Sequence, residues 1–336
     1  MKILGIETSC DETACSVVRD GRDVLANVVA SQIDIHAKTG GVVPEVAARE
    51  HVVHMIPVLD ECLSASGCSW DDIDALAITQ GPGLVSSLII GTETANVISY
   101  VRRKPLIPVQ HIIGHIYSNW LEVENSIEFP VLILTVSGGH NELVLMRGHG
   151  EFEVLGETRD DSAGEAFDKV ARLLGLGYPG GPAISRVAEN GSATAYNFPR
   201  AWLDKGSLDF SFSGLKTSVL DLVKKEGRND DQFKADVGSS FQEAVVEVLA
   251  GKLKRALDVN PDVKEVHLAG GVSANLRLRE VCGEKFGNIK FRFPKKISYC
   301  TDNAAMIACA GFHLFDEALH GVANIVPTTS FEIRHR

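Results

Sequence analysis

The sequence predicts an α/β protein of two lobes, in which one pattern of strands and helices is used twice. The chain has 336 residues, more than a single hydrophobic core usually holds. Strand patterns alternate with helix patterns, which is typical of mixed or parallel sheets. A strand–turn–strand run opens the chain and recurs near residue 130. We therefore expect a mixed sheet in each lobe and a ligand site in the cleft between the lobes.

Three strands are predicted at the start of the chain. β-branched and other apolar residues fill KILGIET, ACSVVRD and VLANVVASQ, and Arg-Asp-Gly-Arg at 19–22 forms a hairpin turn. A long amphipathic helix is predicted from Glu45 to Ala65, because apolar residues recur there at helical spacing. These residues are Val46, Val53, Ile56 and Leu63.

The rest of the first half alternates strands with helices. DALAITQ is predicted as a strand, Gly81-Pro82-Gly83 as a turn, and Leu84 to Val101 as a helix. The short strand PLIPVQ then leads into the segment QHIIGHIYSNWL.

The second half repeats this design. PVLILTVSGGHNELVLMRG is predicted as a strand, a glycine turn and a second strand. The helix DVGSSFQEAVVEVLAGKLKRAL, the strand EVHLAGG and the turn at 270–275 follow. Between about 190 and 235 the pattern loosens, which predicts an insertion of short helices and loops. We expect an N-terminal lobe of residues 1–110 and a C-terminal lobe of residues 111–336 that carries this insertion.

Composition narrows the class of function. The net charge of −11 argues against broad, unassisted binding of nucleic acid, which needs many basic side chains at phosphates. No apolar run is long enough for a membrane span, and MKILGIETSC does not have the pattern of a signal peptide. We therefore expect a cytoplasmic protein without membrane partners. Its seven scattered cysteines are expected to be reduced thiols.

Two histidines one helical turn apart form the most informative motif. His111 and His115 share a helix face, so their imidazoles can bind one transition metal ion from the same side. Packed core histidines are the other interpretation of this pair. Asp302 is the best local candidate for a third ligand, although its place at the start of a small-residue helix also suits an N-cap.

The residue after the first histidine argues against peptide hydrolysis. H-E-x-x-H metalloproteases place a glutamate there as the general base, whereas this chain has Ile112. The motif therefore indicates a metal ion that holds or polarises a substrate.

Glycine turns at strand ends indicate an anion site. Glycine lets backbone N–H groups approach a phosphate closely. Neither a P-loop nor a G-x-G-x-x-G fingerprint is present, which disfavours a P-loop NTPase and a Rossmann dehydrogenase. Two lobes with such hairpins suggest a nucleotide phosphate bound as in actin and the sugar kinases. The strand-end segments that carry Gly, Ser or acidic residues are 7–13, 136–140 and 269–273, and the glycines lie in the second and third of them.

Asp168, in GEAFDKVARLLGL, has two interpretations. Its carboxylate suits a hydrogen bond to a ribose or to a substrate hydroxyl. It also suits a surface ion pair with Arg172, one helical turn further on.

The motifs together resemble one family from residue 1 to about 325. In chain order they are HAKTGGVVPEVAAREH, QGPGLVSSL, HIIGH, VSGGHNEL, GEAFDKVARLLGLGYPGGP, FSFSGLKTS, AGGVSANLRLR and TDNAAMIA. The chain is similar to the tRNA N6-adenosine threonylcarbamoyltransferases, the TsaD family. The resemblance implies the two-lobed actin, Hsp70 and sugar-kinase (ASKHA) fold.

The resemblance also implies a reaction and its residues. Members transfer a threonylcarbamoyl group from threonylcarbamoyl-AMP to N6 of the adenosine beside the anticodon in tRNAs that read ANN codons. By the family motif, His111, His115 and Asp302 bind one iron or zinc ion, and Asp11 and Glu12 are needed for activity. The positions that match contacts to the adenylate are Thr135, Val136, Ser137, Gly138, Gly139, Asp168, Gly181 and Asn275.

Partners follow from the same resemblance. They are tRNA, a TsaB-like paralogue that forms a heterodimer, a TsaE-like ATPase and a TsaC-type enzyme that supplies the substrate. An adenine nucleotide, ATP or ADP, is a further expected ligand. Three rival functions remain from the residues alone: a zinc metallopeptidase, an actin-like ATPase or sugar kinase, and a regulatory scaffold that binds nucleotide without chemistry.

Overall fold

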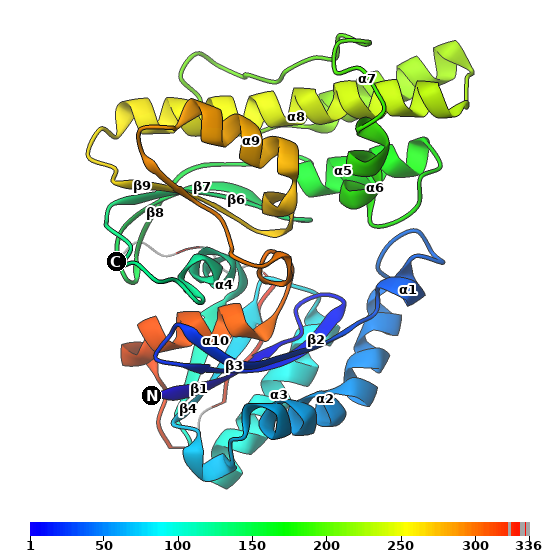
Figure 1. Ribbon diagram of the computed structural model, residues 1–336. Helices are drawn as coiled ribbons and strands as arrows, with labels where there is room; N and C mark the ends of the chain where they lie inside the picture. The colour runs from blue at the N-terminus through cyan, green and yellow to red at the C-terminus, as the bar shows by residue number, and fades with distance from the viewer. Residues whose placement is uncertain (322–323, 330–332, 334–336) are drawn as a thin grey trace. The chain divides into compact units, whose positions relative to one another are not determined.

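The computed structural model describes residues 1–321, 324–329 and 333, and these form two units (Figure 1). Unit 1 comprises Met1–Ile127, Gly148–Glu151 and Pro294–Arg336, and unit 2 comprises Glu128–Arg147 and Phe152–Phe293. The predicted boundary at residue 110 differs from this division, because residues 111–127 and the C-terminal segment belong to unit 1.

Packing explains the difference in the boundary. Helix α10 (Ala304–His313) contacts every strand of the first sheet, and α4 (His111–Tyr117) packs against α10. The glycine at position 5 allows the start of α10 to pack directly against β1, since a Cβ there would lie 2.3 Å from the carbonyl oxygen of Ala304. The sequence gives no local sign of this long-range contact, so the C-terminal helix could not be assigned to the first unit from its pattern.

Unit 1 is built on a five-stranded mixed sheet in the order β3-β2-β1-β4-β5. β1 pairs antiparallel with β2 and parallel with β4, and β4 pairs parallel with β5. The strands are β1 (Lys2–Glu7), β2 (Glu12–Arg19), β3 (Asp23–Ser31), β4 (Ala75–Gly81) and β5 (Leu106–Gln110). All five match predicted strands, with ends shifted by one or two residues.

Helices cover both faces of this sheet. α10 lies on one face, and α2 (Pro44–Ser66) and α3 (Val85–Arg102) lie on the other, as Figure 1 shows. A short helix α1 (Ile33–His36) precedes α2. The core between α2, α3 and the sheet is apolar and includes Leu4, Ile6, Val17, Met55, Val58, Leu59, Leu76 and Ile78.

The apolar stripe predicted for the first long helix is wrong in part. Val53 and Ile56 are 63% and 58% exposed, although they recur at helical spacing. The face of α2 that meets the sheet instead contains His51 and Met55 together with Val58 and Cys62. A polar histidine can occupy this face because its ring nitrogens are hydrogen-bonded, which the hydrophobic pattern does not reveal.

Unit 2 repeats the sheet, in the order β10-β9-β6-β7-β8. β6 pairs antiparallel with β7 and parallel with β9, as β1 does with β2 and β4. The strands are β6 (Val131–Val136), β7 (Asn141–Gly148), β8 (Glu151–Glu157), β9 (Glu265–Ala269) and β10 (Lys290–Arg292). The predicted duplication of a hairpin followed by parallel strands is therefore confirmed.

A large apolar core joins one face of this second sheet to helices. Leu132, Leu134 and Val136 of β6 point into it with Leu143 and Leu145 of β7. The helices are α5 (Ala163–Leu173), α6 (Gly180–Ala188), α7 (Ser213–Glu226), α8 (Asp231–Val259) and α9 (Leu276–Lys285). The insertion expected at 190–235 contains coil, α7 and the first turn of α8.

Two further expectations concern the chain as a whole. Each of the seven cysteines has a free thiol, as predicted. None of the helices in the described part of the chain combines the length and the apolar character that crossing a membrane requires.

Candidate metal site and glycine cradle

The three predicted metal ligands lie together in unit 1. Their ligand atoms are all within 4.8 Å of one another. Asp302 Oδ1 lies 3.1 Å from His115 Nε2 and 3.5 Å from His111 Nε2. The two imidazole rings are nearly perpendicular, with centroids 4.7 Å apart. Local structure creates this geometry, since both histidines are on α4 and Asp302 lies two residues before the start of α10.

The alternative role predicted for Asp302 is wrong. The N-cap of α10 is Asn303, whose side chain accepts a hydrogen bond from Met306 N. The carboxylate of Asp302 is therefore not needed at the helix terminus and faces the two histidines instead. Their charge lowers its pKa below the ordinary value, although burial alone would raise it.

Buried polar atoms test whether a cation fits here. His115 is fully buried, and within the described residues its Nε2 makes no hydrogen bond of good geometry despite the nearby Asp302 oxygen. Lone pairs that converge on a common point without hydrogen bonds between them are expected of metal ligands. The donor set of two imidazoles and one carboxylate suits iron or zinc. The residues therefore fit a transition metal ion.

Glu7 fixes the orientation of the first histidine. Glu7 is fully buried at the end of β1, and its Oε2 lies 3.1 Å from His111 Nδ1. A carboxylate oxygen only accepts, so with a metal ion bound Nδ1 would keep its proton against Glu7 and Nε2 would present its lone pair to the metal. Ser9 N and Thr79 Oγ1 each donate to Glu7 at 2.5 Å. Burial raises the pKa of Glu7, but the charge of His111 and the hydrogen bonds with His111 and Ser9 lower it by more, so the net shift is downward.

The two predicted acidic residues lie beside this site. Asp11 is buried in the loop between β1 and β2, and Glu12 begins β2, where its Oε1 accepts a hydrogen bond from Ser31 Oγ at 3.1 Å. The pKa of Glu12 is well above its ordinary value because of burial and the negative charges of Asp302 and Asp11. A cation at the three ligands would offset this repulsion.

Sequence analysis placed Glu7 and Ser9 in a segment expected to bind an anion and gave His51 no role, whereas the structure places Glu7 and Ser9 against His111. His51 Nε2 donates to the carbonyl oxygen of Cys10 at 3.0 Å, and Thr13 Oγ1 lies 2.8 Å from His51 Nδ1. Burial lowers the pKa of His51, so the ring is neutral, and its hydrogen bonds hold the loop that carries Asp11. The signal was the histidine at the end of the motif HAKTGGVVPEVAAREH, where sequence analysis assigned it no role.

Replacing Glu7 with Gln tests this orienting role. The amide can donate to His111 Nδ1, which favours the tautomer with its proton on Nε2 and so blocks the metal lone pair. We expect metal affinity to fall by about 10- to 100-fold, as for other partners of metal-bound histidines. Competition with a chromophoric chelator measures this. The exposed carboxylate variant Glu45→Gln is the matched control, and unchanged metal affinity in Glu7→Gln would contradict the assignment.

The predicted substrate residues lie in unit 2. Thr135 and Val136 end β6, and the turn Ser137-Gly138-Gly139 follows. A Cβ added at Gly138, Gly139, Gly181 or Gly271 would meet no atom within 4 Å. We call these four open glycines the glycine cradle. β6 and β9 are adjacent parallel strands, so the turns that contain Gly138 and Gly271 follow the same sheet edge.

The start of α5 supports the cradle. Ser162 caps this helix and also donates to the carbonyl oxygen of Gly138 at 2.7 Å. A Cβ at Gly164 would lie 2.4 Å from the carbonyl oxygen of Ser137, so helix and turn are in close contact. A helix N-terminus with free backbone N–H groups favours an anion. The cradle therefore suits a phosphate.

Asp168 and Asn275 hold helices in place. Asp168 Oδ1 accepts a hydrogen bond from Gly180 N at 2.6 Å and so fixes the start of α6 next to Gly181. Asn275 caps α9 through Leu278 N, and its Nδ2 donates to Ser185 Oγ and Gln242 Oε1. These contacts give both residues a positioning role within unit 2.

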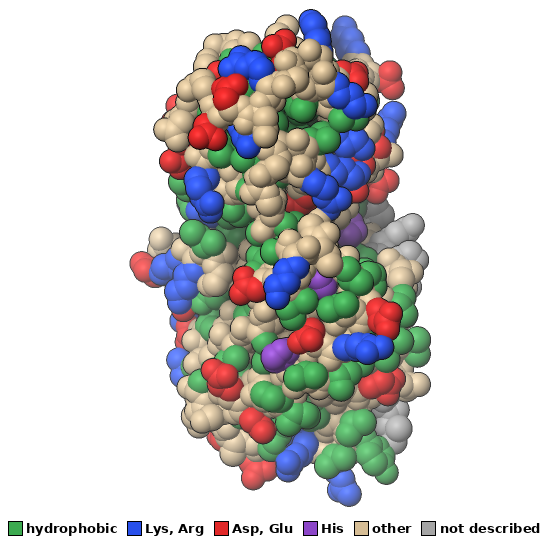
Figure 2. Space-filling view, turned by 90° about the vertical axis from the view of Figure 1, so that its right-hand side faces the viewer, with side chains coloured by type: hydrophobic (Ala, Val, Ile, Leu, Met, Phe, Trp, Pro, Cys, Tyr) green, Lys and Arg blue, Asp and Glu red, His purple; other side chains and the backbone are tan. Residues whose placement is uncertain are grey.

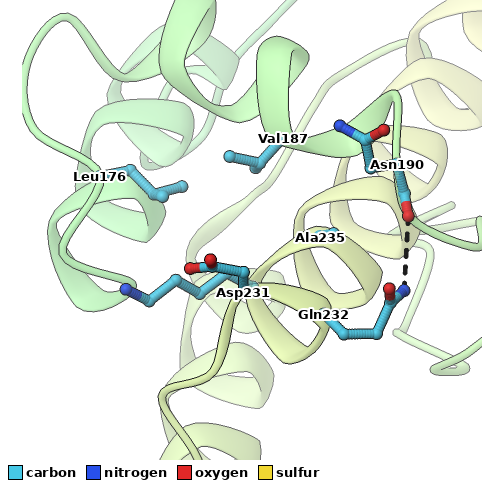
Figure 3. A pocket seen from close by; sticks show the side chains of 7 residues that line it. Leu176, Val187, Asn190, Asp231, Gln232 and Ala235 are labelled. Atoms are coloured by element: carbon cyan, nitrogen blue, oxygen red, sulfur yellow. Dashed lines mark hydrogen bonds between the residues drawn. The ribbon is translucent and has the colours of Figure 1, made fainter.

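A separate cavity in unit 2 contains none of the predicted residues. It has a volume of about 320 Å³ and lies between the end of α6 and the start of α8 (Figure 3). Gln232 Nε2 donates to the carbonyl oxygen of Asn190 across its rim at 3.4 Å. Its remaining lining is Leu176, Val187, Asp231, Lys234 and Ala235.

Solved structures identify the fold class. The chain superposes on HypF from T. kodakarensis with a TM-score of 0.63 and 16% identity, over 94% of this chain and 48% of that one. Component A of the (R)-2-hydroxyglutaryl-CoA dehydratase of Acidaminococcus fermentans gives 0.51 and 14%, over 93% and 98%. Fold and site together define an α/β protein of the actin, Hsp70 and sugar-kinase type with a candidate His–His–Asp metal site.

Sequence relatives identify the family. The model of the family "TsaD: tRNA N6-adenosine threonylcarbamoyltransferase" matches residues 23–309. The enzyme of that name from Bacillus licheniformis is 50% identical over 95% of this chain and 93% of its own length. Those of Bacillus anthracis and Thermomicrobium roseum are 52% and 51% identical, each over 94% of this chain and 92% of their own lengths. The chain belongs to the tRNA N6-adenosine threonylcarbamoyltransferase family.

Proposed function

We propose that this protein transfers a threonylcarbamoyl group from threonylcarbamoyl-AMP to N6 of the adenosine beside the anticodon in tRNAs that read ANN codons. The observation that carries the proposal is the meeting of His111, His115 and Asp302 in a chain of this family. The donor is a mixed anhydride with AMP as a good leaving group. Its transfer needs orientation of the donor and stabilisation of charge on the carbonyl oxygen.

The residues of unit 1 would hold one iron or zinc ion. With an open coordination position, such an ion supplies Lewis-acid polarisation of a carbonyl oxygen. Glu7 orients His111 as a ligand, and His51 holds the loop that carries Asp11. Asp11 or Glu12 would accept the proton that the adenosine amine loses.

The glycine cradle of unit 2 would hold the phosphate of the adenylate. Gly138, Gly139, Gly181 and Gly271 leave the space that a phosphate needs, and α5 directs its N-terminus toward the turn. The same cradle would bind ATP or ADP. Thr135, Val136, Ser137, Asp168 and Asn275 would complete this adenylate site as contacts or as supports.

Two rivals fit the site less well. A peptidase needs a carboxylate that activates water, yet position 112 is a fully buried isoleucine. Glu7 is the nearest substitute, but Ser9, Thr79 and His111 already use its oxygens. A sugar kinase or plain ATPase of this fold has no use for two buried histidines and an aspartate that meet at one point.

The exposed apolar face of unit 1 suits a protein partner. Figure 2 shows hydrophobic side chains that reach this side of the molecule. Val53 and Ile56 of α2 and Val97, Tyr100 and Val101 of α3 are each more than half exposed. Apolar helix faces of this kind are typical of subunit interfaces. We propose that this face binds the TsaB-like paralogue that the family resemblance implies.

Charged substitutions on α2 test the partner face. Val53→Asp with Ile56→Asp should weaken binding of a TsaB-like paralogue by about 100-fold, because two carboxylates would be desolvated at the contact. The melting temperature should change little, since both side chains are exposed. Val259→Asp, at a 66% exposed valine of α8, is the matched control. Isothermal titration measures the affinity, and wild-type affinity in the double variant would exclude this face.

The remaining proposed partners are a TsaE-like ATPase and a TsaC-type enzyme that makes the donor. A tRNA substrate implies a cytoplasmic site of action.

The direct test of the proposed function is reconstitution with threonine, bicarbonate, ATP, the partner proteins and unmodified tRNA. Nucleoside analysis of the tRNA should show threonylcarbamoyl-adenosine only when this chain is present. Proteolysis of a glycoprotein, or ATP turnover by the chain alone without tRNA modification, would favour a rival function.

A further inference from the structure

Two polar side chains on the second sheet each have a buried atom without a hydrogen-bond partner among the described residues. They are Thr135, through Oγ1, and Glu142, through Oε2. Thr135 ends β6 and is fully buried, and Glu142 lies near the start of β7. The two residues are directly opposite in the antiparallel pairing of these strands. Opposite residues point to the same face, with Cβ atoms about 5 Å apart.

An unpartnered carboxyl oxygen at this depth is costly. Burial of a polar group without a hydrogen bond opposes folding, and most such groups in native proteins have partners. Burial and the charge of Glu157 raise the pKa of Glu142 to about 7, compared with an ordinary value of 4.5. Ionisation of Glu142 near neutral pH therefore lowers the stability of the folded protein. A glutamine or a methionine at this position does not ionise and would avoid this loss.

The pair lies beside the glycine cradle, on the face of the sheet opposite the helix-packed core, where Thr135, Ile133 and Val144 are fully buried. Leu134, Val136 and Leu143 point into the helix-covered core of unit 2. Side chains alternate along a strand, so Thr135 and Glu142 point to the opposite face. Thr135 is two residues before Ser137, at which the cradle turn begins. A phosphate at Gly138 and Gly139 would thus place the rest of its molecule within reach of this pair.

The chemistry of the two side chains limits the group they can bind. A phosphate oxygen would be repelled by an ionised Glu142. A carboxylate oxygen pairs instead with an N–H or O–H donor, and the threonine hydroxyl can donate or accept beside it. An adenylate that carries a carbamoyl group offers such neutral donors close to its phosphate: the ribose hydroxyls and the carbamoyl N–H.

We propose that Glu142, with Thr135, is a substrate-contacting residue that accepts a hydrogen bond from a ribose hydroxyl or a carbamoyl N–H of the bound adenylate. The choice of adenylate rests on the proposed function, whereas the binding site itself rests on the geometry of unit 2. The contact supplies the partner that both side chains lack, and it selects a ligand with a donor next to its phosphate.

Glu142→Met tests the contact, because methionine has a similar length and no strong acceptor. Glu142→Gln keeps one acceptor oxygen and should partly restore binding. Glu189→Met, at an exposed residue after α6, is the matched control. Binding of AMP and of threonylcarbamoyl-AMP is measured by isothermal titration, and KM and kcat follow from the reconstituted reaction.

We expect Glu142→Met to bind the adenylate at least about 10-fold more weakly, the worth of one hydrogen bond to a charged group. Weaker AMP binding would identify a ribose hydroxyl as the donor. An effect on threonylcarbamoyl-AMP alone would identify the carbamoyl N–H. KM should rise more than kcat falls. Affinities within twofold of wild type for both ligands would overturn the proposal, and so would a loss that appears only with Mg²⁺ present, since a cation would then occupy the site.

Thermal stability measurements distinguish a ligand-binding role of Glu142 from a structural role. The raised pKa means that the folded state holds the Glu142 proton more tightly, so ionisation opposes folding as pH rises from about 4.5 through 7. The ligand-free Glu142→Met protein should therefore melt no lower than wild type at about pH 8. A lower melting temperature there would indicate a structural role and overturn the proposal. AMP binding that depends on Glu142 without tRNA modification would leave the contact intact and reject the proposed function instead.

Discussion

His115→Ala should remove the metal ion and reduce threonylcarbamoyl transfer by about 1,000-fold or more. The histidine is fully buried, and its Nε2 faces Asp302 at 3.1 Å. Loss of one ligand of three leaves a weak site, and the polarisation supplied by a bound ion contributes several kcal/mol to such reactions. Asp302→Asn should act similarly, because the amide has one neutral oxygen in place of the charged ligand.

The assay is the reconstituted tRNA modification, with metal content measured on the same samples. His320→Ala, at an exposed histidine of unit 1, is the matched control and should behave as wild type. His111→Ala is less suitable, since it also leaves the buried carboxylate of Glu7 without its partner. A His115→Ala protein that transfers at wild-type rate would show that the three residues are not a catalytic metal site.

Gly139→Val should weaken adenylate binding by about 100-fold, or ~3 kcal/mol, with little change in stability. A Cβ at this glycine meets no atom within 4 Å, so the side chain fits the folded protein and occupies the phosphate space instead. AMP titration measures the affinity, and thermal unfolding measures the stability.

Gly164→Ala should instead reduce the stability of the protein. A Cβ there lies 2.4 Å from the carbonyl oxygen of Ser137, so α5 or the turn must shift, at a cost of about 2 kcal/mol in stability. The two glycines are therefore separable: one keeps space for a ligand, and the other keeps helix and turn in contact. If Gly139→Val bound AMP normally, the cradle would not be a phosphate site.

The long elements of the fold could be predicted from the sequence because their patterns are local. The helices predicted at 45–65 and 84–101 match α2 and α3 within one residue at each end. Short or weakly patterned elements were missed, among them β10 with three residues and α9, half of whose ten residues are charged. Such segments become helix or strand through tertiary packing, which a single sequence does not display.

In the candidate site, too, the features set by local sequence could be predicted and those set by tertiary packing could not. The spacing of His111 and His115 predicts a shared helix face, and the structure confirms that face. The contact of Glu7 with His111 was missed because a glutamate at the end of a strand has many roles, and only the fold shows its carboxylate against the first histidine. The N-cap role of Asp302 was wrong for a local reason: the adjacent Asn303 caps the helix equally well and leaves the aspartate free.

Metal analysis of the purified chain tests the central claim most directly. Wild-type protein loaded with iron or zinc under reducing conditions should contain one ion per chain. Its X-ray absorption spectrum should fit two imidazole nitrogens and a carboxylate oxygen at about 2.0–2.2 Å from the metal. The triple variant His111→Ala, His115→Ala, Asp302→Ala should contain none. An ion retained by that folded variant, or a wild-type chain that binds no metal yet modifies tRNA fully, would contradict the account.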